Sequence, residues 1–407
     1  MIRPMHKQSS SRPFPGVAGC FIMLAFLSGV LLHDPVRAAL PDGDITQDGE
    51  LSVADYLHGL QHVIGSRTLL GDAVTQGDVA PLLNGVPDPN GTLDAADVMV
   101  LLRMILYGIN FSYPSNQFNI GDSIGEGEAA DGTIGEPNHE SVWSTGYDSG
   151  DGVNTINERL ESVAPNEYAA NNSTVDTIYN KAVSGAIMAD FVAQAQAVVT
   201  DASQLPGGAG MITVLLGNND VCAASTSDMT DPLLFENQFR AGLDVLAVNE
   251  ATRLSQIHIS GLPAIYRLWT AKYADGWCRV FVWPNVPCQN LLDEPDDDCE
   301  DAVSRNDPDM IYSGDGNNCI RRKHFHQTVR EDYNSVLQSV TREYRESGQL
   351  PNIRYTDIYD VQFSSVHVNG SFLRGDCFHP SREGHALLAN ESWCRTHWGR
   401  ASGQCSN

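Results

Sequence analysis

The stretch Phe118-Asn119-Ile120-Gly121-Asp122-Ser123 sets the fold that this chain can adopt. Its first three residues predict a short apolar strand, and the Gly-Asp-Ser that follows predicts a tight turn where the strand ends. A serine hydroxyl at such a turn is a poor nucleophile until a nearby imidazole removes its proton. Gly-Asp-Ser is also a common turn composition, so its meaning depends on what the rest of the chain supplies.

A second informative stretch, Asp376-Cys377-Phe378-His379, lies near the other end of the chain. A carboxylate three residues before a histidine allows one turn of chain to hold that carboxylate against Nδ1 of the imidazole. Nε2 of His379 is then free to face a serine from elsewhere in the fold. The two stretches together indicate a nucleophilic serine with its base and an orienting acid.

Two more stretches end in residues that can donate hydrogen bonds. Asn180–Gly185 ends an apolar strand in a glycine, and Met211–Asp220 ends another strand in Gly-Asn-Asn-Asp. The oxyanion of a tetrahedral intermediate needs preorganised donors, and a glycine N–H and an asparagine carboxamide can supply two of them. These stretches therefore add a candidate oxyanion site to the candidate nucleophile.

In this order the four motifs resemble those of the SGNH, or GDSL-type, serine hydrolases, over residues 117–395. The resemblance implies that Ser123 is the nucleophile, that His379 is the base and that Asp376 orients the imidazole. It also implies an α/β fold of three layers, α/β/α, with a parallel, flavodoxin-like sheet of five strands.

The resemblance further implies an oxyanion hole built from the backbone N–H groups of Ser123 and Gly185 and from the side chain of Asn219. The run Asn219–Cys222 and the sequence around His379 look most like the secreted phospholipase-B-type branch of the family. That branch implies a lipid or phospholipid ester as the substrate.

Beyond residue 116 the chain alternates between strand and helix patterns, which predicts a parallel sheet covered on both faces. The expected strands are residues 118–120, 177–183, 211–216, 256–260 and 353–356, and the expected helices are residues 186–199, 236–254, 324–345 and 382–393. Because open α/β sheets place their ligand sites at the carboxyl ends of strands, we expect Ser123, Gly185 and Asn219 to meet at one edge.

Residues 267–322 do not fit this alternation. The segment holds four cysteines, several prolines and an acidic run, with little periodicity. A loop of this length is usually functional or stapled. Its aromatic residues could form a wall or lid beside the substrate, or the segment could be a disulfide-stapled excursion with a small core of its own. The sequence leaves both possibilities open.

The 407 residues include 51 acidic and 25 basic side chains, which gives a formal net charge of −26. Such a charge argues against nucleic acid and anionic membrane surfaces as partners, and it attracts divalent cations. The length is ample for one large α/β domain, expected over residues 117–407, and a smaller module before it.

The N-terminus has the features of an export signal. Basic residues at positions 3, 7 and 12 precede the apolar run Val17–Leu32, and Val36-Arg37-Ala38 offers small residues for cleavage after Ala38. We therefore predict a signal peptide over residues 1–38 and a secreted protein, extracellular or periplasmic. The alternative is a membrane anchor, but the apolar run is short for a span, and we expect no stable membrane insertion.

Eight cysteines remain after residue 38, and an even number in an exported chain predicts disulfides. They are Cys222, Cys278, Cys288, Cys299, Cys319, Cys377, Cys394 and Cys405. Cys377 and Cys222 lie next to expected site residues, and we expect each to be bonded to the other or to a cysteine of residues 278–319. Cys394 and Cys405 are expected to form a local pair.

A small acidic module precedes the α/β domain. Its first loop has oxygen ligands at positions 1, 3, 5, 9 and 12 and a glycine, Gly49, at position 6, which is the pattern of a calcium loop. The ligands are Asp44, Thr46, Asp48, Ser52 and Asp55, and a helix is expected over residues 53–64.

The pattern repeats with Gly91 at position 6 and an expected helix over residues 96–106. The expected ligands are Asp88, Asn90, Asp94 and Asp97, while Val86 stands where position 1 should supply a carboxylate. Two such units resemble a type I dockerin over residues 39–109, followed by a linker over residues 110–116. The resemblance implies structural calcium and a cohesin-like protein partner. The alternative is a pair of Asp/Gly turns in an acidic chain.

Together these features predict an exported serine esterase, acting on carboxylic esters, that needs no cofactor for catalysis. One alternative is a carbohydrate O-acetyl esterase, because dockerin-like modules often accompany polysaccharide-degrading enzymes. Another is a non-catalytic binding protein that docks through its small module. Loss of Ser123 or His379 would have favoured the last alternative, and both residues are present.

Overall fold

The computed structural model describes residues 40–83, 85–169, 179–224, 226–288, 292, 328–370 and 375–405. The predicted signal peptide lies outside these described residues, as do Cys299 and Cys319. Residues 38–407 form one compact unit, so the expected boundary at residues 110–116 stays a prediction.

A parallel sheet forms the centre of the molecule. Its strands are β3 (Gln117–Gly121), β4 (Met211–Leu215), β5 (Gln256–Ser260) and β6 (Ile353–Thr356), in the order β3-β4-β5-β6. Every residue of β3, β4 and β5 is buried, because helices cover both faces of the sheet. The expected parallel sheet and four of its strands are therefore confirmed.

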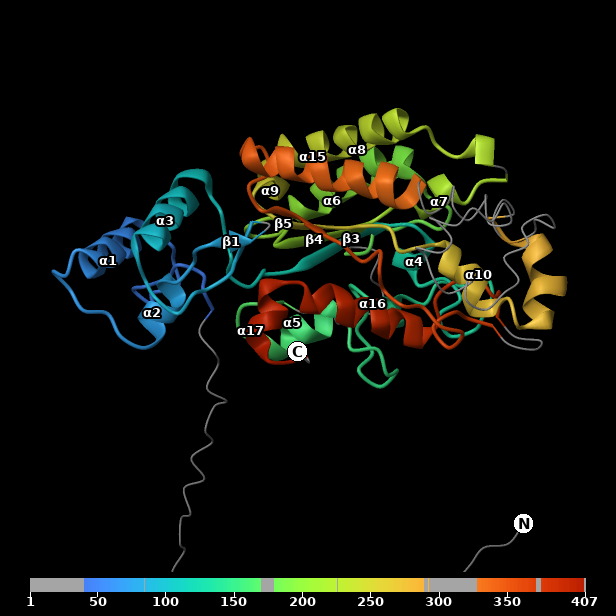
Figure 1. The fold of residues 1–407 in the computed structure, drawn as a ribbon, viewed down its shortest axis with the longest axis horizontal. Helices are drawn as coiled ribbons and strands as arrows, with labels where there is room; N and C mark the ends of the chain where they lie inside the picture. The colour runs from blue at the N-terminus through green and yellow to red at the C-terminus, as the bar shows by residue number, and fades with distance from the viewer. Residues whose placement is uncertain are drawn as a thin grey trace, which may run out of the picture. The chain divides into compact units, whose positions relative to one another are not determined.

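Helices lie on both sides of this sheet (Figure 1). One face carries α6 (Phe191–Ala202), α8 (Pro232–Ala247), α9 (Glu250–Arg253) and α15 (Asn334–Glu346), and the other carries α5 (Ile156–Val163), α16 (Arg382–Cys394) and α17 (His397–Ser402). The helix expected over residues 236–254 is thus two helices. The break comes where the Asn249 side chain donates to the Val245 carbonyl at 2.6 Å and ends α8.

The fifth expected strand, residues 177–183, is not confirmed. Residues 170–178 lie outside the described part of the chain, and beyond them Asn180 makes an isolated parallel bridge to Asn119 of β3. The Asn119 N–H donates to the Tyr179 carbonyl and its carbonyl accepts from the Lys181 N–H, both at 2.8 Å. The segment therefore runs beside β3 and leads directly into the loop of Gly185.

The N-terminal module has three helices, α1 (Val53–Val63), α2 (Asp72–Gly77) and α3 (Ala95–Tyr107), and a hairpin of β1 (Leu82–Leu83) and β2 (Val86–Pro87). The two longer helices follow the two expected loops, whereas α2 and the hairpin were not expected. The module has a small core made of Ile45, Val79, Leu93, Leu101 and Met104, to which Phe111 of the expected linker also contributes. Gly77 packs so closely against this core that an added Cβ would lie 2.1 Å from Leu93.

The described start of the cysteine-rich segment is helical. It contains α10 (Tyr266–Lys272), a π-helical turn (Cys278–Val282) and a 3₁₀ turn (Trp283–Asn285). Trp269 and Trp283 are buried in the main core, while Leu268 lines a pocket. The described residues therefore supply a wall of the pocket, and they pack into the main core rather than into a small core of their own.

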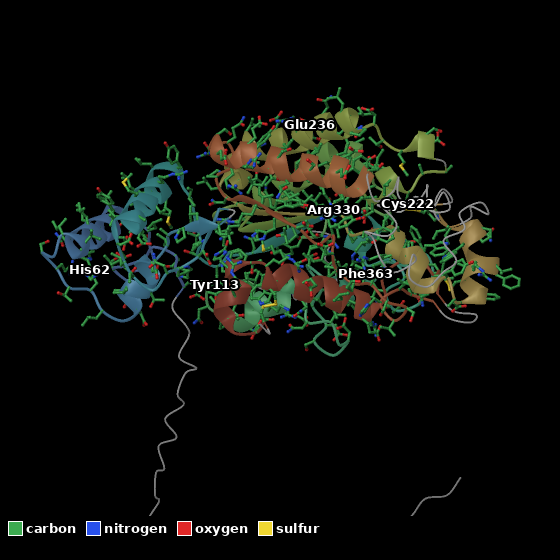
Figure 2. The ribbon with its side chains drawn as sticks, in the orientation of Figure 1. His62, Tyr113, Cys222, Glu236, Arg330 and Phe363 are labelled. Atoms are coloured by element: carbon green, nitrogen blue, oxygen red, sulfur yellow. A yellow bond between two sulfur atoms is a disulfide. The ribbon has the colours of Figure 1, made fainter. Side chains whose placement is uncertain are left out.

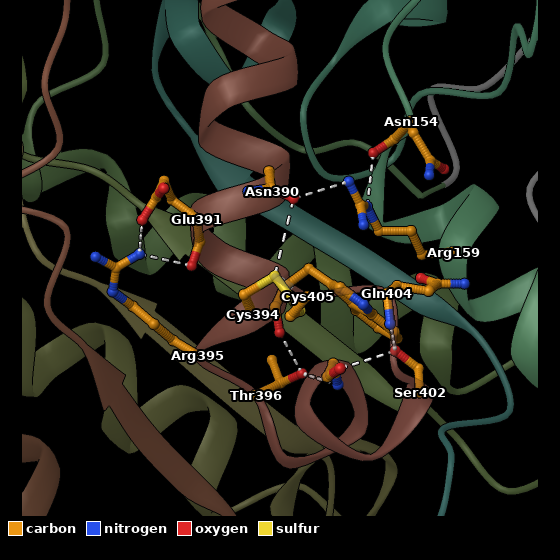
Figure 3. Close-up of a disulfide and its surroundings, with 12 residues drawn as sticks. Asn154, Arg159, Asn390, Glu391, Cys394, Arg395, Thr396, Ser402, Gln404 and Cys405 are labelled. Atoms are coloured by element: carbon orange, nitrogen blue, oxygen red, sulfur yellow. Dashed lines mark hydrogen bonds and ion pairs between the residues drawn. A yellow bond between two sulfur atoms is a disulfide. The ribbon is translucent and has the colours of Figure 1, made fainter. Parts of the chain in front are cut away.

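Three disulfides join described cysteines. The expected local pair Cys394–Cys405 is confirmed and ties the end of α16 to the C-terminal residues (Figure 3). The other two, Cys222–Cys288 and Cys278–Cys377, confirm that the cysteines beside the expected site bond to the cysteine-rich segment. They are not bonded to each other.

Candidate active site

The turn at the end of β3 places Ser123 at the start of the short helix α4 (Ser123–Glu126). Asp122 caps this helix, because its side chain accepts the Ile124 N–H at 3.0 Å. Its other carboxylate oxygen accepts from Nδ2 of Asn218 at 2.9 Å, which ties the turn to the short helix α7 (Asn218–Val221) after β4. Burial is the main cause that raises the pKa of Asp122. Asp122 therefore holds the turn, while Ser123 lines the pocket.

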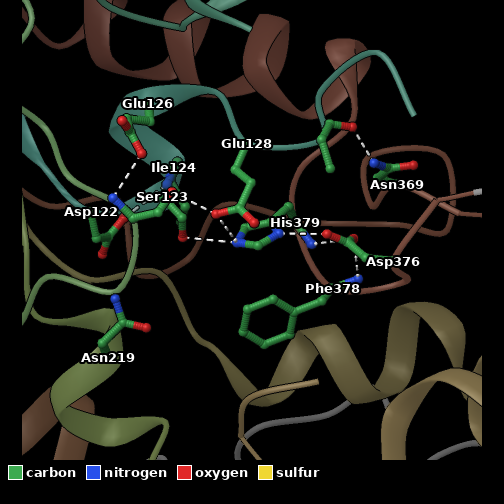
Figure 4. Close-up of polar contacts among 12 residues, drawn as sticks. Asp122, Ser123, Ile124, Glu126, Glu128, Asn219, Asn369, Asp376, Phe378 and His379 are labelled. Atoms are coloured by element: carbon green, nitrogen blue, oxygen red, sulfur yellow. Dashed lines mark hydrogen bonds and ion pairs between the residues drawn. The ribbon is translucent and has the colours of Figure 1, made fainter. Parts of the chain in front are cut away.

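The structure brings Ser123, His379 and Asp376 into one line (Figure 4). Oγ of Ser123 lies 2.8 Å from Nε2 of His379, and Nδ1 of His379 lies 2.6 Å from Oδ2 of Asp376. The second oxygen of Asp376 accepts the N–H groups of Phe378 and His379, both at 3.0 Å. The backbone of this turn therefore holds the Asp376 carboxylate in place, and the carboxylate orients the His379 ring.

Charges around His379 favour its protonated form. Burial lowers the pKa of the ring, but the hydrogen bond and charge of Asp376, together with the charges of Glu128 and Asp122, raise the pKa above its ordinary value. Burial raises the pKa of Asp376, but the hydrogen bonds and charge of His379, together with the Phe378 N–H, lower this pKa below its ordinary value. The site is thus prepared to hold an imidazolium next to a carboxylate.

Glu128 is a site residue that the sequence did not reveal. Its Oε2 lies 3.8 Å from Nε2 of His379 and accepts from Oγ of Ser184 at 2.5 Å (Figure 4). Its backbone N–H donates to the Ser123 carbonyl at 3.0 Å. Nothing in the sequence distinguishes Glu128 from other acidic residues, because its role depends on a histidine 251 positions away.

Of the expected oxyanion donors, Ser123 and Asn219 line the pocket in front of Ser123, whereas Gly185 is exposed and is not among the described lining residues. Within the described part of the chain, the N–H groups of Ser123 and Gly185 donate to no protein acceptor. Gly185 has a φ of +81°, in the left-handed region that favours glycine. The Asn219 side chain lines the pocket, but its Nδ2 donates to the Ala186 carbonyl at 2.9 Å. Two donors are therefore available, and the third is engaged by the main chain.

Asp220 links the two loops that carry these donors. Its Oδ2 accepts the Met188 N–H at 2.8 Å, so the loop after β4 is fastened to the loop after Gly185. Burial is the main cause that raises the pKa of this carboxyl to about 6. Asp220 is the last residue of the Gly-Asn-Asn-Asp stretch. Its hydrogen bond with the Met188 N–H explains why an acidic residue stands at this position.

The pocket in front of Ser123 is largely apolar. Its apolar wall includes Ile124, Ile265, Leu268, Phe363, Val368 and Phe378. Cys222 and Phe363, which both line it, lie near α10 in Figure 2. Arg267 is the one permanently charged side chain in the lining that the structure describes.

The cysteine-rich segment fastens the loop that carries the base. Cys377, between Asp376 and His379, is bonded to Cys278. Nε1 of Trp283 donates to the Cys377 carbonyl at 3.0 Å, and Nζ of Lys272 donates to the Gly370 carbonyl at 2.6 Å. The position of the imidazole therefore depends on residues about a hundred positions earlier in the chain.

The first expected calcium loop is closed by its own carboxylates. Asp44 accepts the N–H groups of Asp48 and Gly49 at 3.1 and 2.8 Å. Asp55 accepts the N–H groups of Thr46 and Ser52, both at 2.8 Å. Carboxylate and hydroxyl oxygens are the ligands that calcium prefers, so the donor set fits this ion. Among the described residues, however, no group of three or more acidic, histidine or cysteine side chains is already gathered around one point.

The second loop corrects the expected position 1. Asp78 accepts the N–H groups of Asn90 and Gly91 at 3.2 and 2.6 Å, as Asp44 does in the first loop. Asp97 completes the match, because it accepts the N–H groups of Ala80 and Asp94, both at 2.7 Å.

Asp78, eight positions before Val86, thus makes the contacts in the second loop that Asp44 makes in the first. The hairpin β1–β2 is inserted between the two halves of the loop. Asp88, expected as a ligand, is exposed at the end of this insertion, and its N–H donates to the Pro81 carbonyl. Counting positions along a continuous loop could not find Asp78.

A buried parallel sheet with a Ser-His-Asp line at the carboxyl ends of its strands defines a serine hydrolase of the α/β class. The chain belongs to the GDSL-like lipase/acylhydrolase family, whose model matches residues 118–392. It is therefore a carboxylic ester hydrolase. No curated protein matches the chain.

Proposed function

We propose that this chain is an exported serine esterase that hydrolyses lipid or phospholipid esters. The observation that carries the proposal is the contact of Oγ of Ser123 with Nε2 of His379 at 2.8 Å, beside an apolar pocket. Neutral His379 donates Nδ1–H to Asp376, so its Nε2 accepts the serine proton.

In the proposed reaction Oγ of Ser123 attacks the ester carbonyl carbon as its proton moves to Nε2 of His379. The C–O bond to the alcohol then breaks, and the imidazolium returns the proton to the leaving alcohol. A water molecule attacks the acyl-enzyme with His379 again as the base, which releases the acid and restores Ser123. Asp376 stabilises the imidazolium in both halves.

Three donors stabilise the oxyanion in this proposal. The N–H groups of Ser123 and Gly185 donate to no other described group, so both would be available to the oxyanion. The Asn219 amide exchanges its bond to the Ala186 carbonyl for one to the oxyanion, which is a rotation of one side chain. A donor that matures in the transition state contributes to kcat more than to KM.

The apolar lining supports the lipid substrate. Leu268 and Phe363 would contact an acyl chain, and Arg267 would lie close enough to the pocket to attract the phosphate of a phospholipid. An acetyl group on a sugar would leave most of this apolar surface in contact with water, which is unfavourable.

A panel of four substrates tests the proposal: p-nitrophenyl acetate, p-nitrophenyl palmitate, phosphatidylcholine and acetylated xylan. We expect kcat/KM to be higher for the palmitate than for the acetate, and phosphatidylcholine to be hydrolysed. Ser123→Ala should abolish turnover on every substrate. Preference for acetylated xylan would show a carbohydrate esterase, and absence of turnover by the wild type on all four substrates would point to a binding protein. Activity retained in Ser123→Ala would exclude Ser123 as the nucleophile.

We propose in addition that residues 1–38 direct export and that calcium orders the module of residues 39–109. Asp44, Asp48 and Asp55 would hold the ion in the first loop, and its charge would neutralise the facing carboxylates. A cohesin-like protein is the proposed partner of this module. No helix in the described part of the chain is long and apolar enough to cross a membrane.

A further inference from the structure

A second cavity, of about 310 Å³, lies beside strands β5 and β6. Its walls come from these strands, from the hairpin β1–β2 and from residues 394–400, around the start of α17. It shares no lining residue with the pocket at Ser123. A cavity of this size has room for a small organic molecule as well as for water.

Arg354 of β6 lines this cavity and is 3% exposed. Its Nε donates to the Gly85 carbonyl at 3.3 Å and its Nη1 to the Asn352 carbonyl at 2.8 Å, whereas Nη2 has no partner in the described part of the chain. Burial lowers the pKa of Arg354 to about 9, and the charge that acts on it is another cation, Arg345. A buried cation without a counterion is unfavourable, so this guanidinium lacks its natural complement.

Two buried imidazoles border the same cavity with unused nitrogens. Nε2 of His258 and Nδ1 of His397 have no hydrogen-bond partner among the described residues. Nε2 of His397 lies 2.6 Å from the Phe111 carbonyl, which leaves Nδ1 as the free nitrogen. Native proteins leave few buried polar atoms unpaired, whereas three residues that line this cavity, from three different elements, each have one.

We propose that this cavity binds a small organic oxyanion, a carboxylate or a phosphate ester, with Arg354 as its counterion. A guanidinium binds both groups through paired hydrogen bonds and keeps its charge when buried. The anion would supply the acceptor that Nη2 lacks and would neutralise a charge that nothing described in the chain neutralises.

The charges around the cavity agree with this ligand. Arg395 and Arg400 also line it, in a chain whose net charge is −26. Arg395 is paired with Glu391, so Arg400, which is exposed, is the arginine that can add attraction at the rim. Asp357 is the carboxylate in the described lining; it is exposed and accepts the Tyr359 N–H at 2.9 Å.

Thermal unfolding and titration calorimetry of the full chain test the proposal. The probes are inorganic phosphate and glucuronate, each compared with sodium chloride at the same ionic strength. A ligand that binds the folded state raises the melting temperature. We expect at least one probe to raise it and to bind with a stoichiometry of one, and the stronger probe identifies the phosphate or the carboxylate as the preferred group.

Arg354→Met keeps the length of the side chain and removes the charge, and Arg253→Met, at an exposed position of α9, is the matched control. Because a hydrogen bond to a charged group is worth about ten- to a hundredfold in affinity, Arg354→Met should weaken binding by at least that factor. Arg253→Met should bind as wild type does. Ester hydrolysis should be unchanged in Arg354→Met, so failure here leaves the proposed function standing.

Arg400→Met gives a second test on an exposed residue, which the fold tolerates even if Arg354→Met does not fold. It should weaken binding by a smaller factor than Arg354→Met. Absence of binding by either probe to the wild type would overturn the proposal. Equal stabilisation of wild type, Arg354→Met and Arg400→Met would also overturn it, because the anion would then act without this cavity.

Discussion

At the scale of single residues, the imidazole of His379 contacts both the nucleophilic serine and the acidic side chains of the site. Its Nε2 lies 2.8 Å from Oγ of Ser123 and 3.8 Å from Oε2 of Glu128, while Asp376 holds the other nitrogen. Only the neutral ring can take the serine proton, so activity should rise as the pH rises through the pKa of His379. Groups that raise this pKa move the acid limb of the pH profile to higher pH.

Glu128→Gln tests the carboxylate that the structure adds to the site. Loss of its charge should lower the pKa of His379, so the acid limb of kcat/KM should move to lower pH. Glu126→Gln is the control, because Glu126 accepts the Ser184 N–H and is not among the described groups that act on the pKa of His379. Overlapping pH profiles of Glu128→Gln and wild type would show that Glu128 does not act on the imidazole.

Asn219→Ala tests the third oxyanion donor. We expect kcat to fall roughly 10²–10³-fold, the usual effect of removing one such donor. KM should change much less, because the donor now bonds to the Ala186 carbonyl and would turn to the oxyanion in the transition state. Steady-state kinetics on p-nitrophenyl esters measures both constants. An unchanged kcat with a raised KM would place Asn219 in ground-state binding instead.

At the scale of elements, the two loops of the N-terminal module show how one hydrogen-bond pattern can be built from different lengths of chain. Asp44 and Asp78 each accept two N–H groups from the turn at the central glycine of their loop. The first loop is continuous in sequence, whereas the second has the hairpin β1–β2 inserted within it. Equivalent positions in the two loops are therefore defined by contacts and not by spacing.

The match between the two loops predicts that Asp78 and Asp88 contribute differently to calcium binding. In the full chain, calcium should raise the melting temperature of the module, and Asp78→Ala should reduce that increase. Asp88→Ala, at an exposed acid of the same loop, is the control and should leave the increase unchanged. Differential scanning calorimetry with calcium and with chelator measures both. If Asp88→Ala has the larger effect, the contiguous reading of the loop was correct.

At the scale of the whole molecule, disulfides connect the catalytic loop to a distant segment. Cys278–Cys377 joins residues 99 positions apart and fastens the turn between Asp376 and His379, whereas Cys394–Cys405 closes 11 positions near the C-terminal end. Chain-entropy arguments assign about 5 kcal/mol of stability to the first bridge and about 3 kcal/mol to the second. The first bridge also restrains the position of the turn that carries Asp376 and His379, a role that the second bridge does not have.

Replacing each cysteine pair by alanines separates stability from geometry. Both double variants should melt at lower temperature than wild type. Only the variant Cys278→Ala/Cys377→Ala should also lose kcat at temperatures where it is fully folded, because small displacements of a general base are expensive in rate. Circular dichroism gives the folded range, and ester hydrolysis within it gives kcat. Equal kcat for the two double variants would remove the geometric role of the bridge.

Much of the fold followed from local patterns. The apolar run of residues 211–215 is buried along its whole length, so it is recognisable as a strand without its partners. The Asp376–His379 spacing is equally local, because one turn of chain sets that contact. Helix ends were less predictable, since the boundary between α8 and α9 depends on one side chain of Asn249.

The sequence by itself determined the strand–helix order, the Ser123 turn and the Asp376–His379 pair, because periodicity and turn chemistry act over a few residues. Tertiary structure alone decided that Glu128 approaches His379, that Asp78 serves the loop of Asn90 and that Cys377 bonds to Cys278. It also left Arg354 buried beside a cavity without a counterion. Each of these joins separate parts of the chain, and the energies of such contacts depend on burial and direction, which one stretch of sequence does not carry.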